Sequence, residues 1–218
     1  GLFIITNFNM LDIAFHVDAV KGIHRISWEQ IIKPGATVST SEDSISTGIV
    51  KLDNRLVIIL DFEKIVSDIN PETGLKISEI DDMGVRQRSN VPILIAEDSV
   101  LLNKLIVDSL KKAGYDNLIH TQNGQEAYDV IQACKADGTL KDHVQCVITD
   151  IEMPLMDGHR LTKLIKSDDE TKDIPVVIFS SLVNDEMKRK GEALGADAQL
   201  SKPEIANLVR IIDDLVKK

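Results

Sequence analysis

Residues 144–158 decide the fold, and they read VQCVITDIEMPLMDG. A short, largely apolar run ends at Thr149 and is followed at once by the carboxylate of Asp150. Strands that are buried on both faces have near-continuous apolar runs of this kind. The stretch therefore predicts a buried strand at 144–149, with one acidic side chain at its carboxyl end and then a loop that contains Glu152 and Pro154.

The same order of strand and helix continues on both sides of this stretch. Apolar runs at 91–96, 117–121, 174–179 and 198–201 predict four more strands, and a segment with helical periodicity follows each of the five. The clearest such segment is the last, with Ile205, Leu208, Val209, Ile212 and Leu215 on one face. Alternating strands and helices predict a parallel sheet that is covered on both faces and joined by right-handed crossovers. We therefore expect a doubly wound α/β domain at 92–218.

The first part of the chain has a different pattern. Its apolar runs at 2–6, 13–17, 48–52 and 55–60 are short and β-branched, which predicts strands. Asp53-Asn54 predicts a tight turn between the last two runs, and residues 63–69 fit either a short helix or a continued strand. We expect a mostly-β domain at 1–83, a polar linker at 84–91 and the α/β domain after it.

Composition argues against several classes of protein. Lys and Arg number 25 against 35 Asp and Glu, and a net charge of −10 disfavours nucleic acid or an anionic membrane surface as a partner. Cys134 and Cys146 are too few for a disulfide scaffold, which favours the reducing cytoplasm. No apolar run approaches the roughly 18 residues of a transmembrane helix.

Polar side chains follow four of the five predicted strands of the α/β domain. Glu97 and Asp98 follow the first strand, Asp150 the third, Ser180 the fourth and Lys202 the fifth. Ligands of open parallel sheets bind at the carboxyl ends of the strands. Each signal alone has an ordinary explanation as a loop, a turn or a helix start. Their coincidence in this order indicates one site.

Three clustered carboxylates need a positive partner. Two of them about 4 Å apart repel by about 4 kcal/mol at an effective dielectric constant near 20. Oxygen ligands of this kind suit Mg²⁺, which removes the repulsion. With a lysine and a hydroxyl opposite, Asp150 can act as a nucleophile towards a phosphoryl group and form an aspartyl phosphate.

Residues 92–218 resemble a two-component receiver domain. The matching pieces are LIAEDS at 94–99, ITDIEMPLMDG at 148–158, PVVIFS at 175–180, and the segment 195–203 that contains Lys202-Pro203. The resemblance implies a flavodoxin-like, five-stranded parallel sheet of order 2-1-3-4-5. It also implies that Glu97, Asp98, Asp150 and the backbone carbonyl of Glu152 hold Mg²⁺.

The same resemblance implies the roles of the remaining site residues. Asp150 accepts the phosphate, Lys202 contacts the phosphoryl group and Ser180 is the switch hydroxyl. Three positions depart from the usual pattern: Ser180 replaces a Thr, Ser181 replaces a smaller residue, and Gln199 stands where an aromatic ring is common. The usual coupling between hydroxyl and ring is therefore not expected here.

Residues 1–83 resemble the latter part of a CheW-like chemotaxis coupling domain. The matching segments are IAFHVDAVKGIHRI at 13–26 and STGIVKLDNRLVIILDFEKI at 46–65. The family's module is longer and its first half has no counterpart here, which implies a β-barrel fragment. A coupling domain followed by a receiver is the architecture of CheV-type chemotaxis proteins.

The resemblance implies a signalling adaptor rather than an enzyme. Its expected partners are the cytoplasmic tips of chemoreceptors and a chemotaxis histidine kinase, which is both phosphodonor and scaffold partner. The alternative is a Mg²⁺-dependent phosphohydrolase of the haloacid dehalogenase type. That family has a second Asp where Glu152 stands, and its acidic pair follows the lysine rather than preceding Asp150. A transcriptional regulator is disfavoured because no helix-turn-helix follows residue 203.

Overall fold

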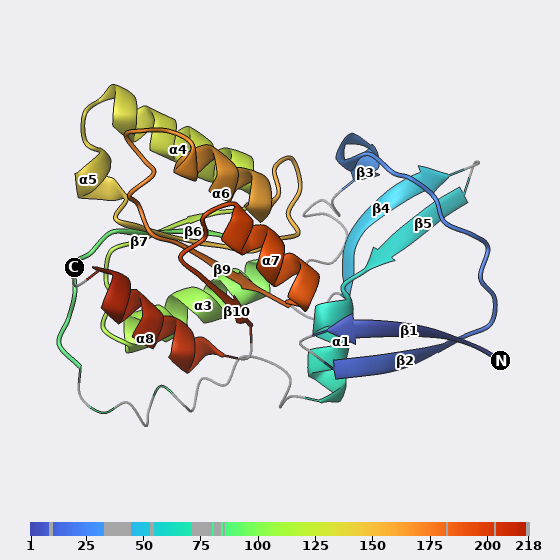
Figure 1. Ribbon diagram of the computed structural model, residues 1–218. Helices are drawn as coiled ribbons and strands as arrows, with labels where there is room; N and C mark the ends of the chain where they lie inside the picture. The colour runs from blue at the N-terminus through green and yellow to red at the C-terminus, as the bar shows by residue number, and fades with distance from the viewer. Residues whose placement is uncertain are drawn as a thin grey trace. The chain divides into compact units, whose positions relative to one another are not determined.

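The chain forms two compact units, Gly1–Gly74 and Leu75–Lys218 (Figure 1). A computed structural model describes residues 1–8, 11–32, 45–52, 55–70, 80, 84, 86–181, 183–202 and 204–216. The predicted turn at 53–54 lies outside the described residues. The predicted domain boundaries at 83 and 92 stay predictions, although residues 86–90 lie within the second unit.

The first unit is mostly β, as the sequence predicts. One antiparallel pair joins β1 to β2, with Leu2 opposite Val17, and a separate antiparallel sheet has the order β3-β4-β5. Residues 63–69 are helical, and Asp61 caps this helix by accepting a hydrogen bond from the Lys64 N–H at 2.8 Å. The elements are β1 (Leu2–Phe8), β2 (Leu11–Val17), η1 (Trp28–Gln30), β3 (Ile31–Ile32), β4 (Ser46–Leu52), β5 (Arg55–Leu60) and α1 (Phe62–Ile69).

The second unit contains a five-stranded parallel sheet of order β10-β9-β8-β6-β7. Numbered along this domain the order is 2-1-3-4-5, which confirms the flavodoxin-like prediction. Its strands are β6 (Ile93–Ala96), β7 (Leu118–Thr121), β8 (Cys146–Thr149), β9 (Val176–Ser180) and β10 (Ala198–Ser201). The predicted strands are all present, and their ends differ from prediction by no more than two residues.

Helices cover both faces of this sheet. Figure 1 shows α3 and α8 on one face and α4 and α6 on the other. The helices are α3 (Val100–Lys112), α4 (Gly124–Ala136), α5 (Leu140–His143), α6 (Gly158–Lys166), α7 (Asp185–Ala193) and α8 (Ile205–Val216). The sequence does not predict α5, because four residues are too short to show a helical period.

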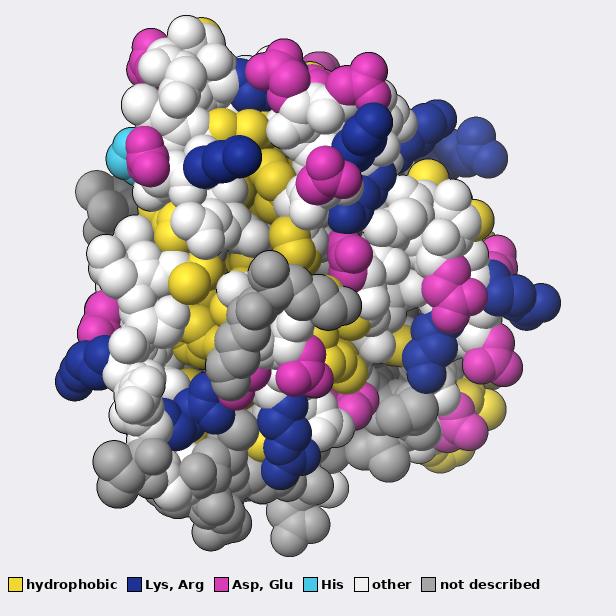
Figure 2. All heavy atoms as spheres, turned by 60° about the vertical axis from the view of Figure 1, so that its left-hand side comes forward, with side chains coloured by type: hydrophobic (Ala, Val, Ile, Leu, Met, Phe, Trp, Pro, Cys, Tyr) yellow, Lys and Arg dark blue, Asp and Glu magenta, His cyan; other side chains and the backbone are white. Residues whose placement is uncertain are grey.

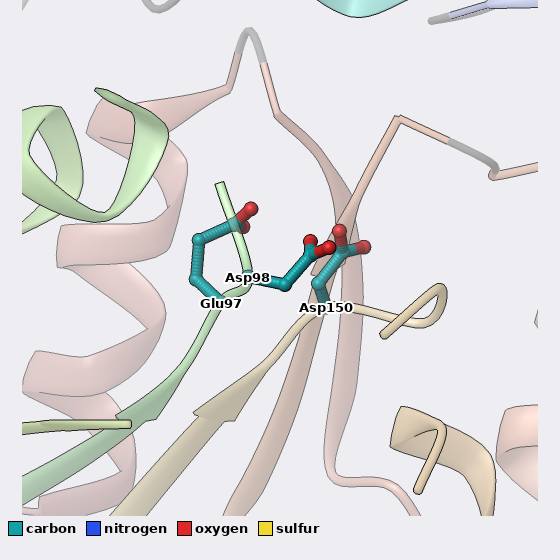
Figure 3. Close-up of side chains that lie close together, drawn as sticks. All are labelled: Glu97, Asp98 and Asp150. Atoms are coloured by element: carbon teal, nitrogen blue, oxygen red, sulfur yellow. The ribbon is translucent and has the colours of Figure 1, made fainter. Parts of the chain in front are cut away.

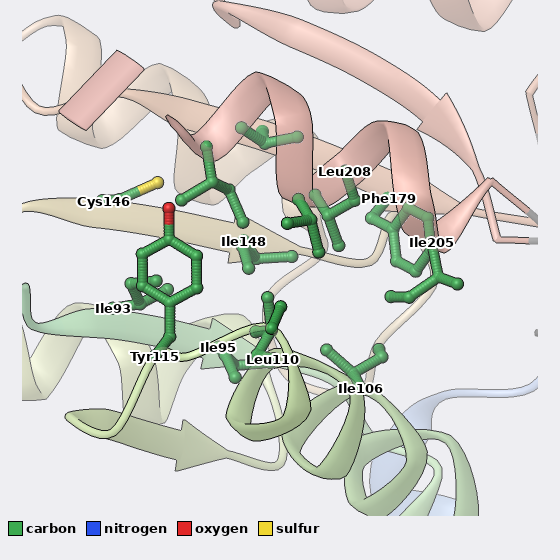
Figure 4. Close-up of a cluster of buried hydrophobic side chains, with 14 of the residues drawn as sticks. Ile93, Ile95, Ile106, Leu110, Tyr115, Cys146, Ile148, Phe179, Ile205 and Leu208 are labelled. Carbon is green, nitrogen blue, oxygen red and sulfur yellow. The ribbon is translucent and has the colours of Figure 1, made fainter. Parts of the chain in front are cut away.

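Alternation along the strands divides the core into two layers. Ile93 and Ile95 of β6 pack with α3 and α8, whereas Leu94 and Ala96 pack with α4 and α6. Figure 4 shows the first layer, in which Phe179 of β9 lies among isoleucines and leucines. Every residue of β6 and β8 is buried. This burial explains why the central strands are apolar throughout.

The surface carries charges of both signs. On the face shown in Figure 2, Lys and Arg side chains alternate with Asp and Glu side chains. In the described parts of the chain, no helix is both long and apolar enough to cross a membrane.

Candidate metal and phosphoacceptor centre

The central strands bring three carboxylates together. β6 and β8 pair in parallel with Ala96 opposite Thr149, so the residues that follow these two positions leave the sheet at the same edge. Glu97, Asp98 and Asp150 each place an oxygen atom within 4.8 Å of the others (Figure 3). The structure therefore assembles the acidic cluster that the sequence predicts.

Lys202 lies between two of these carboxylates. Its Nζ is 2.9 Å from Asp150 Oδ2 and 3.0 Å from Glu97 Oε2. Glu97, Asp150 and Lys202 are 2%, 5% and 3% exposed. Buried charges are costly unless they are paired, and one ammonium group offsets only one of the negative charges. Three carboxylates and one lysine leave two negative charges, which a divalent cation matches. The oxygen donors fit Mg²⁺.

Backbone and amide groups orient the carboxylates. Asp150 Oδ1 accepts a hydrogen bond from the Ile151 N–H at 2.6 Å, and Glu97 Oε1 accepts one from the Ser99 N–H at 3.2 Å. Buried Asn103 of α3 donates its Nδ2 to the Glu97 carbonyl at 3.2 Å. The first two bonds each hold one carboxylate oxygen of Asp150 and Glu97, and the third holds the backbone of Glu97.

The sequence does not predict the supporting roles of two residues at this site, Asn103 and Gly158. Asn103 has the appearance of an ordinary helix residue, and only the fold turns its side chain towards Glu97. Gly158 begins α6, where a Cβ atom would stand 1.9 Å from the Asp150 carbonyl oxygen. Any side chain there would displace the backbone of Asp150. The only sign of this role in the sequence is the Asp157-Gly158 pair, which lies after β8 at the start of α6.

The remaining predicted residues lie at the same edge of the sheet. Ser180 is buried at the end of β9, and its carbonyl accepts a hydrogen bond from the Lys202 N–H at 3.3 Å. Glu152 is exposed in the segment after β8, and the role of its carbonyl in metal binding stays a prediction. Gln199, which stands where the resemblance leads one to expect an aromatic ring, donates its Nε2 to the Lys188 carbonyl of α7 at 2.6 Å.

The loop after Asp150 contains a strained residue. Leu155 has φ 65°, a left-handed conformation that non-glycine residues adopt at a cost, and its side chain is 63% exposed. Leu155→Asn should therefore raise the free energy of unfolding by about 1 kcal/mol, because Asn tolerates this conformation and little burial is lost. Urea denaturation measures the change. Leu101→Asn, on helix α3 and 42% exposed, is the control and should give no gain. An unchanged or lower stability of Leu155→Asn would count against the strain.

We expect the buried His159 of α6 to make the stability of the fold sensitive to acid. Its side chain is buried, and Nε2 has no hydrogen-bond partner among the described residues. Burial, and then the charge of Lys190, lower the pKa of His159 below its ordinary value of 6.5. The unfolded chain therefore binds a proton more readily than the folded chain. The folded state keeps its full stability above pH 6.5 and loses it as the pH falls towards the lowered pKa.

His159→Gln should remove this part of the acid response. We expect the unfolding free energy of the wild type to fall faster than that of the variant below about pH 6.5, by at most about 1.4 kcal/mol per pH unit. Denaturant melts at a series of pH values measure both slopes. His143→Gln, outside the sheet core, is the control. If the unfolding free energies of the wild type and His159→Gln fall equally with pH, His159 is not the source of this acid response.

The sequence matches two known families. Residues 93–213 match the response regulator receiver domain, and residues 1–70 match the CheW-like domain. The chain is 31% identical to the chemotaxis protein CheV2 of Helicobacter pylori, over 100% of this chain and 67% of that protein. It is 26% identical to the chemotaxis protein CheV3 of the same organism, over 99% of this chain and 69% of that protein.

A solved structure shares the fold of the second unit. It is a putative response regulator from Chloroflexus aurantiacus, with a TM-score of 0.52 and 24% identity, covering 60% of this chain and 100% of that chain. The likeness shows the receiver fold around the acidic cluster.

Proposed function

Because this chain belongs to the CheV family of chemotaxis proteins, with a CheW-like domain ahead of a response regulator receiver domain, we propose that it is an adaptor that couples chemoreceptors to a histidine kinase and is regulated by phosphorylation of Asp150. The observation that carries the proposal is the cluster of Glu97, Asp98 and Asp150, in which the buried Glu97 and Asp150 both pair with the Lys202 ammonium. The partners are the cytoplasmic tips of the receptors and the kinase, which places the adaptor in the cytoplasm.

Asp150 is the nucleophile in this proposal. An oxygen of its carboxylate attacks the phosphorus of a phosphohistidine on the kinase, a P–O bond forms and the P–N bond breaks. The imidazole nitrogen keeps the electron pair of the broken bond, so neither oxidant nor reductant is needed. The in-line geometry and the stabilisation of charge supply most of the acceleration in such transfers.

The neighbouring residues manage the charge of the transferred group. Glu97, Asp98, Asp150 and the Glu152 carbonyl would hold Mg²⁺, which offsets the repulsion between the carboxylates and the incoming phosphoryl oxygens. Lys202 moves from the Asp150 carboxylate to a phosphoryl oxygen, and Ser180 supplies a hydroxyl donor. The exposed carboxylate of Glu152 lies two residues after Asp150, where it can repel or misplace an attacking water.

Phosphorylation then acts through charge and packing. A phosphoryl group adds negative charge and acceptor oxygens beside Ser180. Because Gln199 already binds the Lys188 carbonyl, we expect a small movement near residues 180–185 and the first turn of α7 rather than the burial of an aromatic ring. The output is a change in association with receptor and kinase rather than turnover of a substrate.

Co-sedimentation tests the proposed function. The full chain is mixed with receptor-containing membranes and kinase, with and without beryllofluoride, which mimics the phosphoryl group. We expect the chain to sediment with both partners and beryllofluoride to change the bound fraction. Asp150→Asn should sediment equally in both conditions. A chain that stays in the supernatant while it hydrolyses a general phosphate ester would instead support the phosphohydrolase alternative.

A further inference from the structure

Residues 86–90 are fixed to the second unit, although their composition predicts a linker. Arg86 Nε donates to the Ala113 carbonyl at 2.8 Å, at the end of α3. The Ser89 N–H donates to the Gly114 carbonyl at 2.7 Å, and the Ser89 carbonyl accepts from the Asp116 N–H at 3.1 Å. These bonds seat the segment beside the turn between α3 and β7.

The strongest attachment joins this segment to α8. One guanidinium nitrogen of Arg86 lies 2.5 and 2.6 Å from the two carboxylate oxygens of Asp213. Buried Tyr115 donates its hydroxyl to Asp213 Oδ1 at 2.6 Å. The Arg86 and Asp213 side chains are only 21% and 15% exposed, so solvent screens the pair weakly. We call the side chains of Arg86, Tyr115 and Asp213 the clasp.

The turn at Gly114 is shaped for this contact. Gly114 has φ +97°, and a Cβ atom there would stand 2.8 Å from the Gln87 carbonyl oxygen. Burial and the hydrogen bond to Asp213 both raise the pKa of Tyr115, so its hydroxyl keeps the proton that it donates. The clasp is therefore a built contact between the chain before β6 and the end of α8.

Helix α8 runs from the phosphoacceptor site to the clasp. Lys202, which contacts Asp150 and Glu97, precedes the first residue of α8 by three positions, and Asp213 lies in the last turn. Twelve residues give a helix about 18 Å long. Four of its apolar residues are fully buried against the sheet, as Figure 4 shows for Ile205 and Leu208. A helix packed in this way moves as one body.

We propose that α8 carries the phosphorylation state of Asp150 to residues 86–90, and that the Arg86–Asp213 pair is the attachment that makes this possible. This inference rests on the proposed function, because it assumes that Asp150 is phosphorylated. A phosphoryl group gives Lys202 a new partner and so biases the start of α8. The clasp passes that bias to the chain that leads back towards the CheW-like domain.

Hydrogen exchange on the full chain, with and without beryllofluoride, tests the proposal. In the wild type we expect beryllofluoride to change the exchange rate of residues 86–90 by at least about fivefold. Arg86→Ala should still bind beryllofluoride, which is seen as the same rise in melting temperature as in the wild type. In this variant, beryllofluoride should no longer change the exchange rate at 86–90 or the fraction of chain that sediments with receptor and kinase. Arg88→Ala is the matched control: Arg88 pairs with Asp116, its side chain is 76% exposed, and the wild-type response should survive.

Each outcome decides the proposal. A full response in Arg86→Ala, or no response at 86–90 in a wild type that binds beryllofluoride, would overturn it. If Arg86→Ala does not fold, Asp213→Asn replaces it, because the amide keeps the shape of the carboxylate and an acceptor for Tyr115. Failure of the wild type to bind beryllofluoride would refute the proposed function itself, and that result is distinct from a lost response in a loaded site.

Discussion

Asp150→Asn should lose all phosphate incorporation and remain folded. The amide has nearly the shape of the carboxylate and keeps an acceptor for the Ile151 N–H, but it has no anionic oxygen to attack phosphorus. Loss of a nucleophile typically lowers the rate by several orders of magnitude, so we expect a fall of at least about a thousandfold. The substitution also removes one of the negative charges beside Glu97, which should leave stability equal or higher.

Labelling from the phosphorylated kinase measures this effect, and circular dichroism reports the fold. Asp129→Asn is the matched control, because Asp129 is an exposed carboxylate on α4 that bonds to Gln125. It should label like the wild type. If Asp150→Asn labels at the wild-type rate, the nucleophile is another residue and the assignment fails.

Lys202→Ala should both destabilise the chain and slow phosphate transfer. Without the ammonium group, two carboxylates that are 2% and 5% exposed stay buried and unpaired. Breaking a buried pair in this way costs about 3–5 kcal/mol. Added Mg²⁺ should restore part of this stability, because the carboxylates remain available to it. Loss of the charge opposite the transferring group should lower the transfer rate by about 10²–10³.

Urea denaturation with and without Mg²⁺ measures the stability term, and the labelling assay measures the rate. Lys141→Ala is the control, since Lys141 is exposed on α5, which precedes β8, whereas Asp150 follows β8. It should change neither quantity. A Lys202→Ala chain that is as stable as the wild type in the absence of Mg²⁺ would show that the carboxylates do not depend on the lysine.

The acidic cluster was predictable because its signals are local. An apolar run followed by a carboxylate marks the end of a buried strand, and Glu97 and Asp150 follow two such runs. The parallel order of the strands then brings those ends together without any knowledge of side-chain contacts. The fold of the second unit was predictable for the same reason, since its central strands are continuous apolar runs and its helices other than α5 show a helical period.

Contacts between distant segments were not predictable. Arg86 and Asp213 are 127 positions apart, and neither belongs to an apolar pattern that could reveal the pair. Gly158 is required only because α6 begins against the Asp150 carbonyl. In the first unit, the strands at 2–6 and 55–60 were predictable from their composition. The sequence left helix and strand open at 63–69, and the structure shows a helix at 62–69 that Asp61 caps.

The most direct test is to identify the phosphorylated residue chemically. The wild-type chain is phosphorylated by the kinase in Mg²⁺, reduced with borohydride, which converts an aspartyl phosphate to homoserine, and mapped by peptide mass spectrometry. We predict homoserine at position 150, and none when EDTA is present during phosphorylation. Homoserine at another aspartate, or the same yield at position 150 in EDTA, would contradict the account.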